Sequence, residues 1–521
     1  MNTVEFLDIA TAICSDRAAV IFEGKRYTYA ELAQRVNKLA DALSKLGIQK
    51  GDRLAILQVN CNQYIEAYFA TAKLGGIYVP LNFRAREAEL SHMLSNAEAS
   101  ILFVGERYFD LANSMRPNLS SIKHYIGIDG KAEGMLNHEE LLASGSPEEK
   151  TFVEINDDDP TALLYTAGTT GLPKGVPQDH NSYSFYVLQN VNPPDPEIAE
   201  TNLLTMPLYH VAGMQAMLAA IYGGRTIALM RQFDTKEWFE TAQHERVTRA
   251  MLVPTMLKRI VDDPDFNKYD LSNLRVITYG AAACPYEVLK KTIDLFPGRA
   301  LINAFGGTET SSTIAMLRAE DQIITGKETK KEREKKLKRL ASSIGIPLDD
   351  VEVQIRDEES RVLPRGGTGE LVARGPRIMK GYWRDEEKTK KAFTADGWYR
   401  TGDMGYVDEE GYIYLTGRAD DLIVRGGENI SPEEVENVLY THPKVGEAAV
   451  IGIPDIEWGQ QPRAIVVLKK GETATPEEII DFCREKMAGF KRPRSVVFVS
   501  ELPKTSTGKI LRRALREQYG K

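Results

Sequence analysis

Short apolar runs alternate with stretches of helical periodicity up to about residue 310. Thr28 and Glu31 stand three residues apart, the spacing of a capping box, and apolar residues then recur at helical spacing up to Leu46. The chain continues with an apolar run, a helical pattern and a second apolar run, at residues 53–59, 63–73 and 76–81. This alternation is typical of α/β layers around mostly parallel sheets.

The pattern changes after residue 317. Residues 318–340 contain a dense run of charged residues, which is typical of a solvated helix or a mobile surface loop, with contact to nucleic acid as the alternative. Residues 351–355 and 369–373 alternate between apolar and polar positions, which predicts a small β subdomain. From Asp421 onward, 101 residues mix helical and strand patterns, enough for a separate α+β domain.

Composition indicates a folded protein of at least two domains. Apolar residues make up 42% of the 521 residues and charged residues 27%, which are ordinary values for globular proteins. A chain of this length exceeds what one hydrophobic core organises. The net charge of −8 argues against nucleic acid as the main partner, because binding to a phosphate backbone needs a basic surface.

The cysteines and the apolar segments bear on location. Cys14, Cys61, Cys284 and Cys483 form no CxxC pattern, which disfavours a zinc site or a disulfide framework. No run of about 18 apolar residues occurs, and the first residues lack the pattern of a signal peptide. We therefore expect no transmembrane segment and a cytoplasmic location.

The most informative stretch for chemistry is TAGTTGLPKG, from Thr166 to Gly175, which follows an apolar run. Its glycines let the backbone approach a ligand closely, its hydroxyl and amide groups can hydrogen-bond phosphate oxygens, and Lys174 adds a positive charge. The Walker A pattern GxxxxGK[ST] cannot be laid on it, which disfavours a P-loop NTPase. The segment predicts a phosphate-binding loop of another kind.

Further motifs follow downstream: GAAA from Gly280, NAFGGTE from Asn303, YRTGD from Tyr399, GRADD from Gly417, RGGENI from Arg425 and PKTSTGKI from Pro503. With the loop, they resemble in order and spacing the adenylate-forming superfamily of acyl-CoA synthetases, luciferase-like enzymes and peptide-synthetase adenylation domains. The resemblance covers nearly the whole chain. Two positions depart from the usual pattern: Ala167 stands where serine is usual, and Arg425 where a different polar residue is common.

The resemblance implies an ATP site in which the loop cradles phosphates, Phe305 stacks on adenine, Asp403 binds the ribose hydroxyls and Glu309 holds Mg²⁺. An aromatic face suits adenine, and a carboxylate suits a hard cation shared with phosphates. The residues implied to bind ATP or AMP are Thr166, Ala167, Gly168, Thr169, Thr170, Gly171, Lys174, Gly280, Ala281, Ala282, Asn303, Ala304, Phe305, Gly306, Thr308, Asp403, Arg418 and Lys509.

The resemblance also implies the domain organisation. We expect a large N-terminal domain, residues 1–419, of doubly wound α/β sheets with a small β subdomain, followed by a small mobile α+β domain, residues 420–521. Asp420 matches the family's hinge. Gly426 and Gly427 match the loop that lines the CoA tunnel. Lys509 matches the lysine that assists adenylation, where an ammonium stabilises the developing charge.

The acyl side of the site is indicated by a different motif. Pro207 to His210 reads PLYH, which resembles the P-L-[FY]-H motif of acyl- and aryl-CoA ligases, and no aspartate follows to hold an amino-acid ammonium. The expected acyl-pocket residues are His210, Val211, Met214, Tyr279 and Ala304. The candidate pocket segments, residues 211–214, 251–255, 279–281 and 311–315, carry no charged group, so an apolar acid is implied: fatty, aromatic or alicyclic.

We therefore predict an acid–CoA ligase that forms acyl-AMP and pyrophosphate, then acyl-CoA and AMP. Its expected ligands are ATP, Mg²⁺, coenzyme A and a small carboxylic acid, with Lys509, Thr166, Glu309 and His210 as catalytic residues. Two alternatives stay open: a free-standing acyl-AMP ligase that loads a carrier protein, and a non-enzymatic binding protein. Oxygen-dependent light emission is a third. A homodimer and a lysine acetyltransferase acting on Lys509 are further partners to test.

Overall fold

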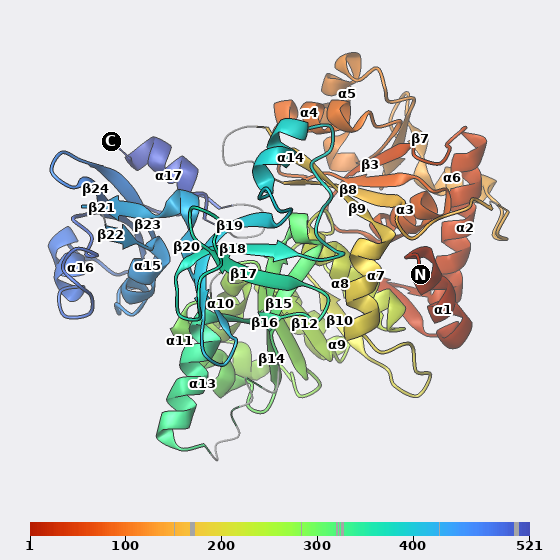
Figure 1. Cartoon of the computed structure of the whole chain (residues 1–521). Coiled ribbons are helices and arrows are strands. Elements are labelled where there is room, and N and C mark those ends of the chain that lie inside the picture. The colour runs from red at the N-terminus through yellow and green to blue at the C-terminus, as the bar shows by residue number, and fades with distance from the viewer. Residues whose placement is uncertain are drawn as a thin grey trace.

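The computed structural model describes residues 1–150, 152–166, 172–282, 284–318, 321, 324, 328–426, 428–504 and 510–520. Figure 1 shows two sheets with their helices in the larger part of the molecule. The chain after Asp421, coloured blue, lies at one end as a smaller unit.

Seven strands of the described chain form one sheet, in the order β7-β6-β5-β3-β4-β8-β9. The strands are β3 (Arg53–Leu57), β4 (Ile77–Pro80), β5 (Ile101–Gly105), β6 (His124–Ile128), β7 (Leu136–Asn137), β8 (Pro160–Thr166) and β9 (Lys174–Asp179). They pair in parallel except for β9, which returns antiparallel to β8.

Thirteen strands of the described chain form a second sheet, in the order β17-β18-β19-β20-β16-β15-β14-β13-β12-β10-β11-β1-β2. The strands from β14 to β1 pair in parallel, and those at both ends pair antiparallel. The parallel strands are β1 (Ala18–Phe22), β10 (Thr201–Leu204), β11 (Thr226–Leu229), β12 (Arg249–Leu252), β13 (Val276–Gly280) and β14 (Ala300–Gly307). The others are β2 (Lys25–Thr28), β15 (Ser312–Leu317), β16 (Ser343–Pro347), β17 (Glu352–Arg356), β18 (Gly369–Arg374), β19 (Tyr399–Val407) and β20 (Ile413–Arg418).

Helices cover both faces of each sheet, as the doubly wound pattern predicts. One apolar core lies between the two sheets and includes residues of α1 (Val4–Cys14), α2 (Tyr29–Lys45), α3 (Asn62–Lys73), α7 (His180–Asn190) and α8 (Val211–Tyr222). On the outer face of the seven-stranded sheet pack α4 (Glu87–Ala97) and α5 (Phe109–Met115). On the outer face of the thirteen-stranded sheet pack α9 (Thr235–His244), α10 (Pro254–Asp262), α11 (Tyr286–Leu295) and α13 (Lys330–Ser342).

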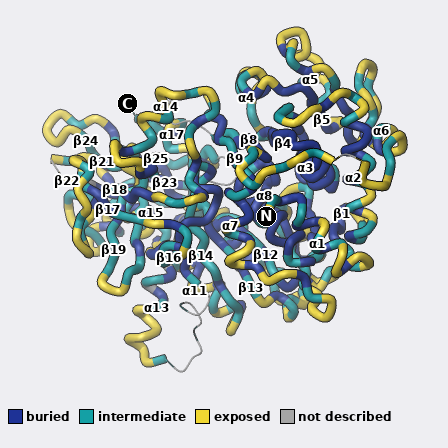
Figure 2. Tube along the Cα trace, turned by 45° about the vertical axis from the view of Figure 1, so that its right-hand side comes forward, coloured by how far each residue is buried: buried dark blue, intermediate teal, exposed yellow. Residues whose placement is uncertain are grey.

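Local sequence explains several of these elements. Thr28 and Glu31 form the predicted capping box at the start of α2, whose buried residues recur at helical spacing. In α8 nearly every residue is buried, because the helix packs in the core between the sheets. Within the charged segment, α13 buries Leu337 and Leu340 and exposes most of its other residues, so the expectation of a solvated helix is confirmed there (Figure 2).

The chain after Asp421 has apolar clusters of its own. It contains β21 (Ile423–Arg425), β22 (Glu428–Ile430), β23 (Val445–Asp455), β24 (Gly459–Leu468), β25 (Ser495–Phe498), α15 (Pro432–Tyr440), α16 (Pro476–Phe482) and α17 (Arg512–Tyr519). These form an α+β unit around one mixed sheet. Asp420 lies in the short 3₁₀ turn η5 (Ala419–Asp421) that precedes it.

Candidate active site

The predicted phosphate loop joins two paired strands. Thr166 ends β8, Lys174 begins β9, and the two residues are cross-strand partners. The loop therefore leaves and re-enters the sheet at one place, with Thr166 and Lys174 at its base. Ala167, Gly168, Thr169, Thr170 and Gly171 lie outside the described residues.

Four side chains from distant parts of the chain meet at the base of this hairpin. Glu309 lies in the 3₁₀ turn η4 (Thr308–Thr310) between β14 and β15. The Thr166 hydroxyl donates to Glu309 Oε1 at 3.4 Å, and the Tyr382 hydroxyl donates to the same oxygen at 3.1 Å. Lys174 Nζ donates to the Tyr382 hydroxyl at 3.0 Å and lies 4.2 Å from the centre of its ring. We call these residues the Glu309 cluster.

Burial shapes the electrostatics of the Glu309 cluster. Burial lowers the pKa of Lys174, although the carboxylate of Glu309 opposes that shift. Burial raises the pKa of Tyr382, and the charge of Glu309 adds to the effect. An ammonium that is poorly solvated is stabilised when an anion is placed beside it. The cluster is therefore suited to a phosphate near Lys174.

A second polar pair lies at the end of the antiparallel strands. Asp403 of β19 and Arg418 of β20 are cross-strand partners, and Arg418 Nη1 lies 3.2 Å from Asp403 Oδ1. Burial, the largest single effect, would lower the pKa of Arg418, but Asp403, Tyr399, Asp421 and Asp420 together outweigh it and raise the pKa. Lys174, Tyr382 and Tyr399 also interact electrostatically with this arginine. The predicted ribose-binding pair therefore lies in the electrostatic surroundings of the Glu309 cluster.

The predicted adenine segments are neighbours at the carboxyl ends of β13 and β14. Gly280 pairs with Ala304, and a Cβ at Gly280 would lie 2.2 Å from the Ala304 carbonyl oxygen. Ala281 follows with a left-handed φ of +66°. Phe305 packs at the edge of an apolar cluster, and Asn303 donates to the Ser343 carbonyl at 3.2 Å. The structure thus brings the strand segments together, with Ala282 and Gly306 adjoining them.

The segment that carries His210 lies at a switch point of the second sheet, where successive connections lead to strands on opposite sides of β10. β10 continues through α8 to β11 on one side, while β11 connects through α9 to β12 on the other side of β10. Ligands of open α/β sheets bind in the crevice at such switch points, outside the carboxyl ends of the strands. His210 caps α8 there, and its Nδ1 accepts from the Ala212 N–H at 3.3 Å.

The five predicted acyl-pocket residues do not share one cluster. Val211 and Met214 are buried in the core between the sheets. Tyr279 is buried on the opposite face of the second sheet, and its hydroxyl donates to the Leu340 carbonyl at 3.4 Å. Ala304 lies on β14, paired with Gly280 and with Met316 of β15. Tyr279 and Ala304 lie near the carboxyl ends of the neighbouring strands β13 and β14, whereas Val211 and Met214 lie on α8. The side chains of Tyr279 and of the two α8 residues pack on opposite faces of the second sheet.

Among the residues predicted for CoA, Gly426 lies in the turn after β21 with a φ of +61°. Its N–H donates to the Trp458 carbonyl at 2.9 Å, and a Cβ there would meet the Trp458 ring at 2.6 Å. Glycine is therefore required at this close approach. Gly427 and Lys509 lie outside the described residues.

Sequence reasoning missed three residues beside the site. Tyr382 links Lys174 to Glu309, as described above. Buried Gln178 donates from Nε2 to the Thr308 carbonyl at 2.8 Å, next to Glu309. Arg377, fully buried, donates to Asp350 and to the Thr313 carbonyl. No motif or residue spacing in the sequence identifies these three residues, because each one contacts a segment that is far away in the sequence.

The donor set of the Glu309 cluster fits a magnesium ion shared with phosphates. A carboxylate and a threonine hydroxyl are the hard oxygen ligands that Mg²⁺ prefers. Over the described ranges, no group of three or more His, Cys, Asp or Glu side chains could hold a metal by itself. Phosphate oxygens would therefore have to complete the coordination, as is usual for Mg²⁺ in nucleotide sites.

The fold and the site define an α/β protein in which a hairpin with the predicted phosphate loop, a polar cluster around Glu309 and a smaller C-terminal unit are combined. The chain belongs to the AMP-binding enzyme family: residues 8–383 match that family, and residues 434–509 match the AMP-binding enzyme C-terminal domain.

Relatives of the chain are similar over nearly their whole length. Indoleacetate–CoA ligase of Aromatoleum aromaticum is 31% identical, with 99% of this chain and 98% of that protein covered. Long-chain-fatty-acid–CoA ligase FadD13 of Mycobacterium tuberculosis is 34% identical, with 95% and 93% covered. The crystal structure of ATP-bound MatB from Rhodopseudomonas palustris superposes with a TM-score of 0.87 at 28% identity, covering 100% and 99%.

These comparisons confirm several predictions from the sequence. The superfamily, the fold class, the enzyme class of AMP-forming acyl-CoA synthetase and the ligands ATP, Mg²⁺ and coenzyme A are borne out. The roles of individual residues and the domain boundary stay predictions. Among the described residues, no helix has both the length and the apolar character needed to cross a bilayer.

Proposed function

We propose that this ligase activates an apolar carboxylic acid, a medium- or long-chain fatty acid or an aromatic or alicyclic acid, and transfers its acyl group to coenzyme A. The observation that carries the proposal is the Glu309 cluster, where Thr166, Lys174 and Tyr382 converge on one acidic residue. The names of the relatives, which act on indoleacetate and on long-chain fatty acids, support this class of acid.

In the first half-reaction, an oxygen of the acid attacks the α-phosphorus of ATP, and pyrophosphate leaves. We assign the phosphates to the loop from Thr166 to Lys174, and the ribose hydroxyls to Asp403 beside Arg418. Glu309 and Thr166 are suited to hold Mg²⁺, which when bound would neutralise charge on the phosphates. These residues position the reactants and stabilise charge, and no side chain acts as the nucleophile.

In the second half-reaction, the sulfur of coenzyme A attacks the acyl carbon and AMP leaves. We assign Lys509 to the first step and the loop at Gly426 and Gly427 to the second. The small domain, residues 420–521, would rotate about Asp420 between the two steps, so that each group reaches the site in turn. The protein forms no covalent intermediate in this scheme.

The acid is assigned to the switch point beside His210. Tyr209, next to it, is buried against Phe83, with ring centres 5.5 Å apart. Gln215, one helical turn after Val211, is buried, and neither amide atom has a hydrogen-bond partner in the part of the chain that the structure describes. Apolar groups with one uncharged amide suit the body of an apolar acid rather than a second carboxylate.

The test is AMP release across C2 to C18, aromatic and alicyclic acids, with and without coenzyme A, alongside ATP–pyrophosphate exchange. We expect exchange with an apolar acid and AMP release only when coenzyme A is added. Glu309→Gln should reduce exchange by about 100-fold or more, whereas the exposed control Glu387→Gln should retain it. Exchange without release on coenzyme A would favour loading of a carrier protein, and absence of exchange with every acid would contradict the proposal.

Three further properties remain proposals. We infer a cytoplasmic location from the composition of the chain, in which the four cysteines are buried and unpaired. A homodimer would show as twice the monomer mass in light scattering. Acetylation of Lys509 would remove the charge assigned to adenylation, so an acetyltransferase that modifies it would switch the first half-reaction off.

A further inference from the structure

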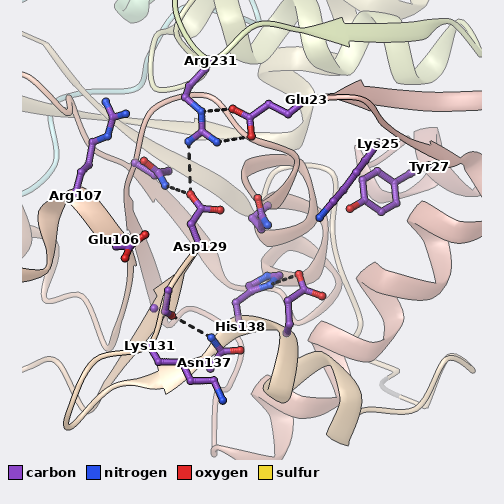
Figure 3. A pocket seen from close by; sticks show the side chains of 15 residues that line it. Glu23, Lys25, Tyr27, Glu106, Arg107, Asp129, Lys131, Asn137, His138 and Arg231 are labelled. Atoms are coloured by element: carbon purple, nitrogen blue, oxygen red, sulfur yellow. Dashed lines mark hydrogen bonds and ion pairs between the residues drawn. The ribbon is translucent and has the colours of Figure 1, made fainter.

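The carboxyl edge of the seven-stranded sheet carries an open cleft of about 910 Å³ as well as the β8–β9 hairpin. The cleft lies at the switch point of this sheet, where β3 and β5 are neighbours but the chain continues into α3 on one face and into α5 on the other. Figure 3 shows Lys25 on one side of it and Glu106 and Arg107 on the other, with Arg231 paired to Glu23. Charges that are paired or lie on opposite sides do not form one anion site.

Helix α4 lies beside the β8–β9 hairpin, on the outer face of the same sheet. One face of α4 belongs to the apolar cluster against which Tyr165 of β8 and Trp383 also pack. The buried residues of that face are Leu90, Met93, Leu94 and Ala97. This packing brings polar groups of α4 within hydrogen-bond distance of the hairpin that carries the predicted phosphate loop.

The residue before Lys174 is held by His92 of α4. The half-buried His92 has its Nε2 3.1 Å from the Pro173 carbonyl oxygen. A carbonyl oxygen can only accept, so Nε2 carries a proton and donates it. This hydrogen bond fixes the peptide that leads into Lys174, which is the cross-strand partner of Thr166.

The residue after Lys174 is held from the same helix through Trp383. The Trp383 N–H donates to the Gly175 carbonyl at 2.8 Å, and its ring Nε1 donates to the Asn96 carbonyl at 3.1 Å. A Cβ at Gly175 would lie 3.1 Å from the Trp383 Cβ, so the two segments pass close to each other. Because Tyr382 directly precedes Trp383, the same anchor helps to place the hydroxyl that accepts from Lys174 Nζ.

The other strand of the hairpin is tied to α4 as well. The Tyr165 hydroxyl, one residue before Thr166, lies 2.7 Å from Asn96 Oδ1 and 3.0 Å from the Met93 carbonyl oxygen. Helix α4 therefore bonds to both strands of the hairpin and to the segment that carries Tyr382.

We propose that His92 is a positioning residue for the binding of the ATP phosphates. It acts through Pro173 and Lys174, because its hydrogen bond fixes the backbone from which the Lys174 ammonium reaches Tyr382 and the phosphates. A cation on a flexible side chain binds more tightly when less of the chain beneath it has to be ordered. The inference rests on the proposed function of the hairpin as a phosphate loop.

The test is calorimetric titration of the full chain with Mg-ATP and with AMP, in the absence of any carboxylic acid. His92→Phe keeps a ring but cannot donate, so we expect its affinity for ATP to fall by about 5- to 10-fold. AMP has one phosphate where ATP has three and fewer charge-assisted bonds to lose, so its affinity should change by less than about twofold. Thioester formation from supplied acyl-AMP, which uses no ATP, should be retained.

Three further variants separate positioning from packing. His92→Gln places an amide N–H near the position of Nε2, so it should restore the affinity for ATP to within about twofold of the parent chain. Trp383→Phe removes the indole N–H that donates to Asn96, and it should weaken ATP binding by a factor similar to that of His92→Phe. The control His124→Phe alters a half-buried histidine at the amino end of β6, on the opposite edge of the sheet, and should leave both affinities unchanged.

The inference is overturned if His92→Phe binds ATP like the parent chain, if its affinity for AMP falls as much as that for ATP, if His92→Gln binds ATP as weakly as His92→Phe, or if the parent chain binds no ATP. These titrations need no acid. A parent chain that binds ATP but shows no exchange with any acid would contradict the proposed function alone, and the His92 variants would still decide the role of this residue.

Discussion

At the scale of single residues, Tyr382 connects the two charges of the Glu309 cluster. Its hydroxyl accepts from Lys174 and donates to Glu309, so it separates an ammonium from a carboxylate that would otherwise attract each other directly. Holding the two apart leaves each charge available for its proposed role, Lys174 for phosphate and Glu309 for a cation. Tyr382 is in this sense a positioning residue, since it acts through two others.

Tyr382→Phe should therefore slow adenylation while leaving the fold intact. The ring remains under the Lys174 ammonium, but two hydrogen bonds to charged groups are lost, each worth about 1.5–3 kcal/mol. We expect ATP–pyrophosphate exchange to fall by about 10- to 100-fold, with a raised KM for ATP. Tyr412→Phe, which removes a comparable bond to Asp321 at a distance from the cluster, is the control. Equal losses in both variants would refute the positioning role.

His180 makes the docking of the first helix sensitive to pH. Its Nδ1 accepts from the Thr3 N–H at 3.1 Å, which requires an unprotonated nitrogen. Burial lowers the pKa of His180 from 6.5 to about 4. The nearby carboxylates of Asp159, Asp179 and Asp157 oppose this shift but do not cancel it. The unfolded chain therefore binds a proton before the folded chain does as pH falls.

This contribution to stability is fully present above pH 6.5 and is lost as pH falls towards 4. It amounts to about 3 kcal/mol when a shift of this size is converted at 1.36 kcal/mol per pKa unit. His180→Asn keeps an acceptor but does not titrate, so its unfolding midpoint should fall less between pH 6.5 and pH 4 than that of the parent chain. Parallel pH profiles for the two proteins would show that His180 is not responsible.

At this scale, the sequence could identify those candidate site residues that stand in recognisable motifs. Glu309, Asp403 and Arg418 stand in recognisable patterns, and the structure places Glu309 with Thr166 and Arg418 with Asp403. Tyr382 stands in no such pattern, because its partner Lys174 is 208 positions away and the contact arises only through packing. Tyr279 shows the reverse: its position on the strand was predictable, but the face taken by its side chain was not.

At the scale of elements, one segment fastens the turn that carries Glu309. The Met379 N–H donates to the Glu309 carbonyl at 2.9 Å, and the Ser311 hydroxyl donates to the Arg377 carbonyl at 2.7 Å. Arg377 also donates to the Thr313 carbonyl at 2.6 Å. Ser311 and Ser312 have positive φ values, a conformation that costs free energy and must be held by its surroundings.

Arg377→Met should destabilise the protein and misplace Glu309. Arg377 is fully buried with Asp350, and removing one partner of such a pair leaves a buried charge, at a cost of about 3–5 kcal/mol. Arg374→Met is the control, because its pair with Glu352 is exposed and worth about 1 kcal/mol or less. Urea unfolding of both variants measures the difference. Similar losses would contradict this account, and adding Asp350→Leu to Arg377→Met should recover stability.

Element boundaries were predictable where local signals are strong. The capping box set the start of α2, and the alternating runs at 351–355 and 369–373 correspond to β17 and β18. The order of strands was not predictable, because it depends on pairings such as β1 with β11, which join residues about 200 positions apart. Hydrophobic periodicity indicates which face of a strand or helix is buried, but it does not indicate which strand lies beside it.

At the scale of the whole molecule, both sheets have a switch point among their parallel strands, and the residues beside the two switch points differ in charge. In the second sheet, the residues beside the switch point at His210 are apolar: Val211 and Met214 are buried in the core between the sheets. In the first sheet, Glu106 and Arg107 follow β5 at the equivalent position, and Lys25 of β2 in the second sheet lines the same cleft. The surroundings of the two switch points thus differ, with apolar side chains at one and charged side chains at the other.

The rotation proposed about Asp420 should be blocked by proline. Asp420→Pro fixes φ near −65° and disfavours the helical region at Ala419, so it restricts the turn between the two parts of the chain. If the two half-reactions need two orientations of the small domain, proline should permit one orientation and prevent the other. We expect one half-reaction to stay within about threefold of the parent chain and the other to fall by about tenfold or more.

The two half-reactions are measured separately, by ATP–pyrophosphate exchange and by thioester formation from supplied acyl-AMP. Asp420→Ala is the control, because it removes the carboxylate but leaves the backbone free to rotate, and both of its rates should be retained. If Lys509 has the role proposed for it, Lys509→Ala should show a defect in the first step alone, with exchange lost and thioester formation spared. If Asp420→Pro slows both half-reactions equally, or neither, while the protein stays folded, then rotation at this position does not separate them.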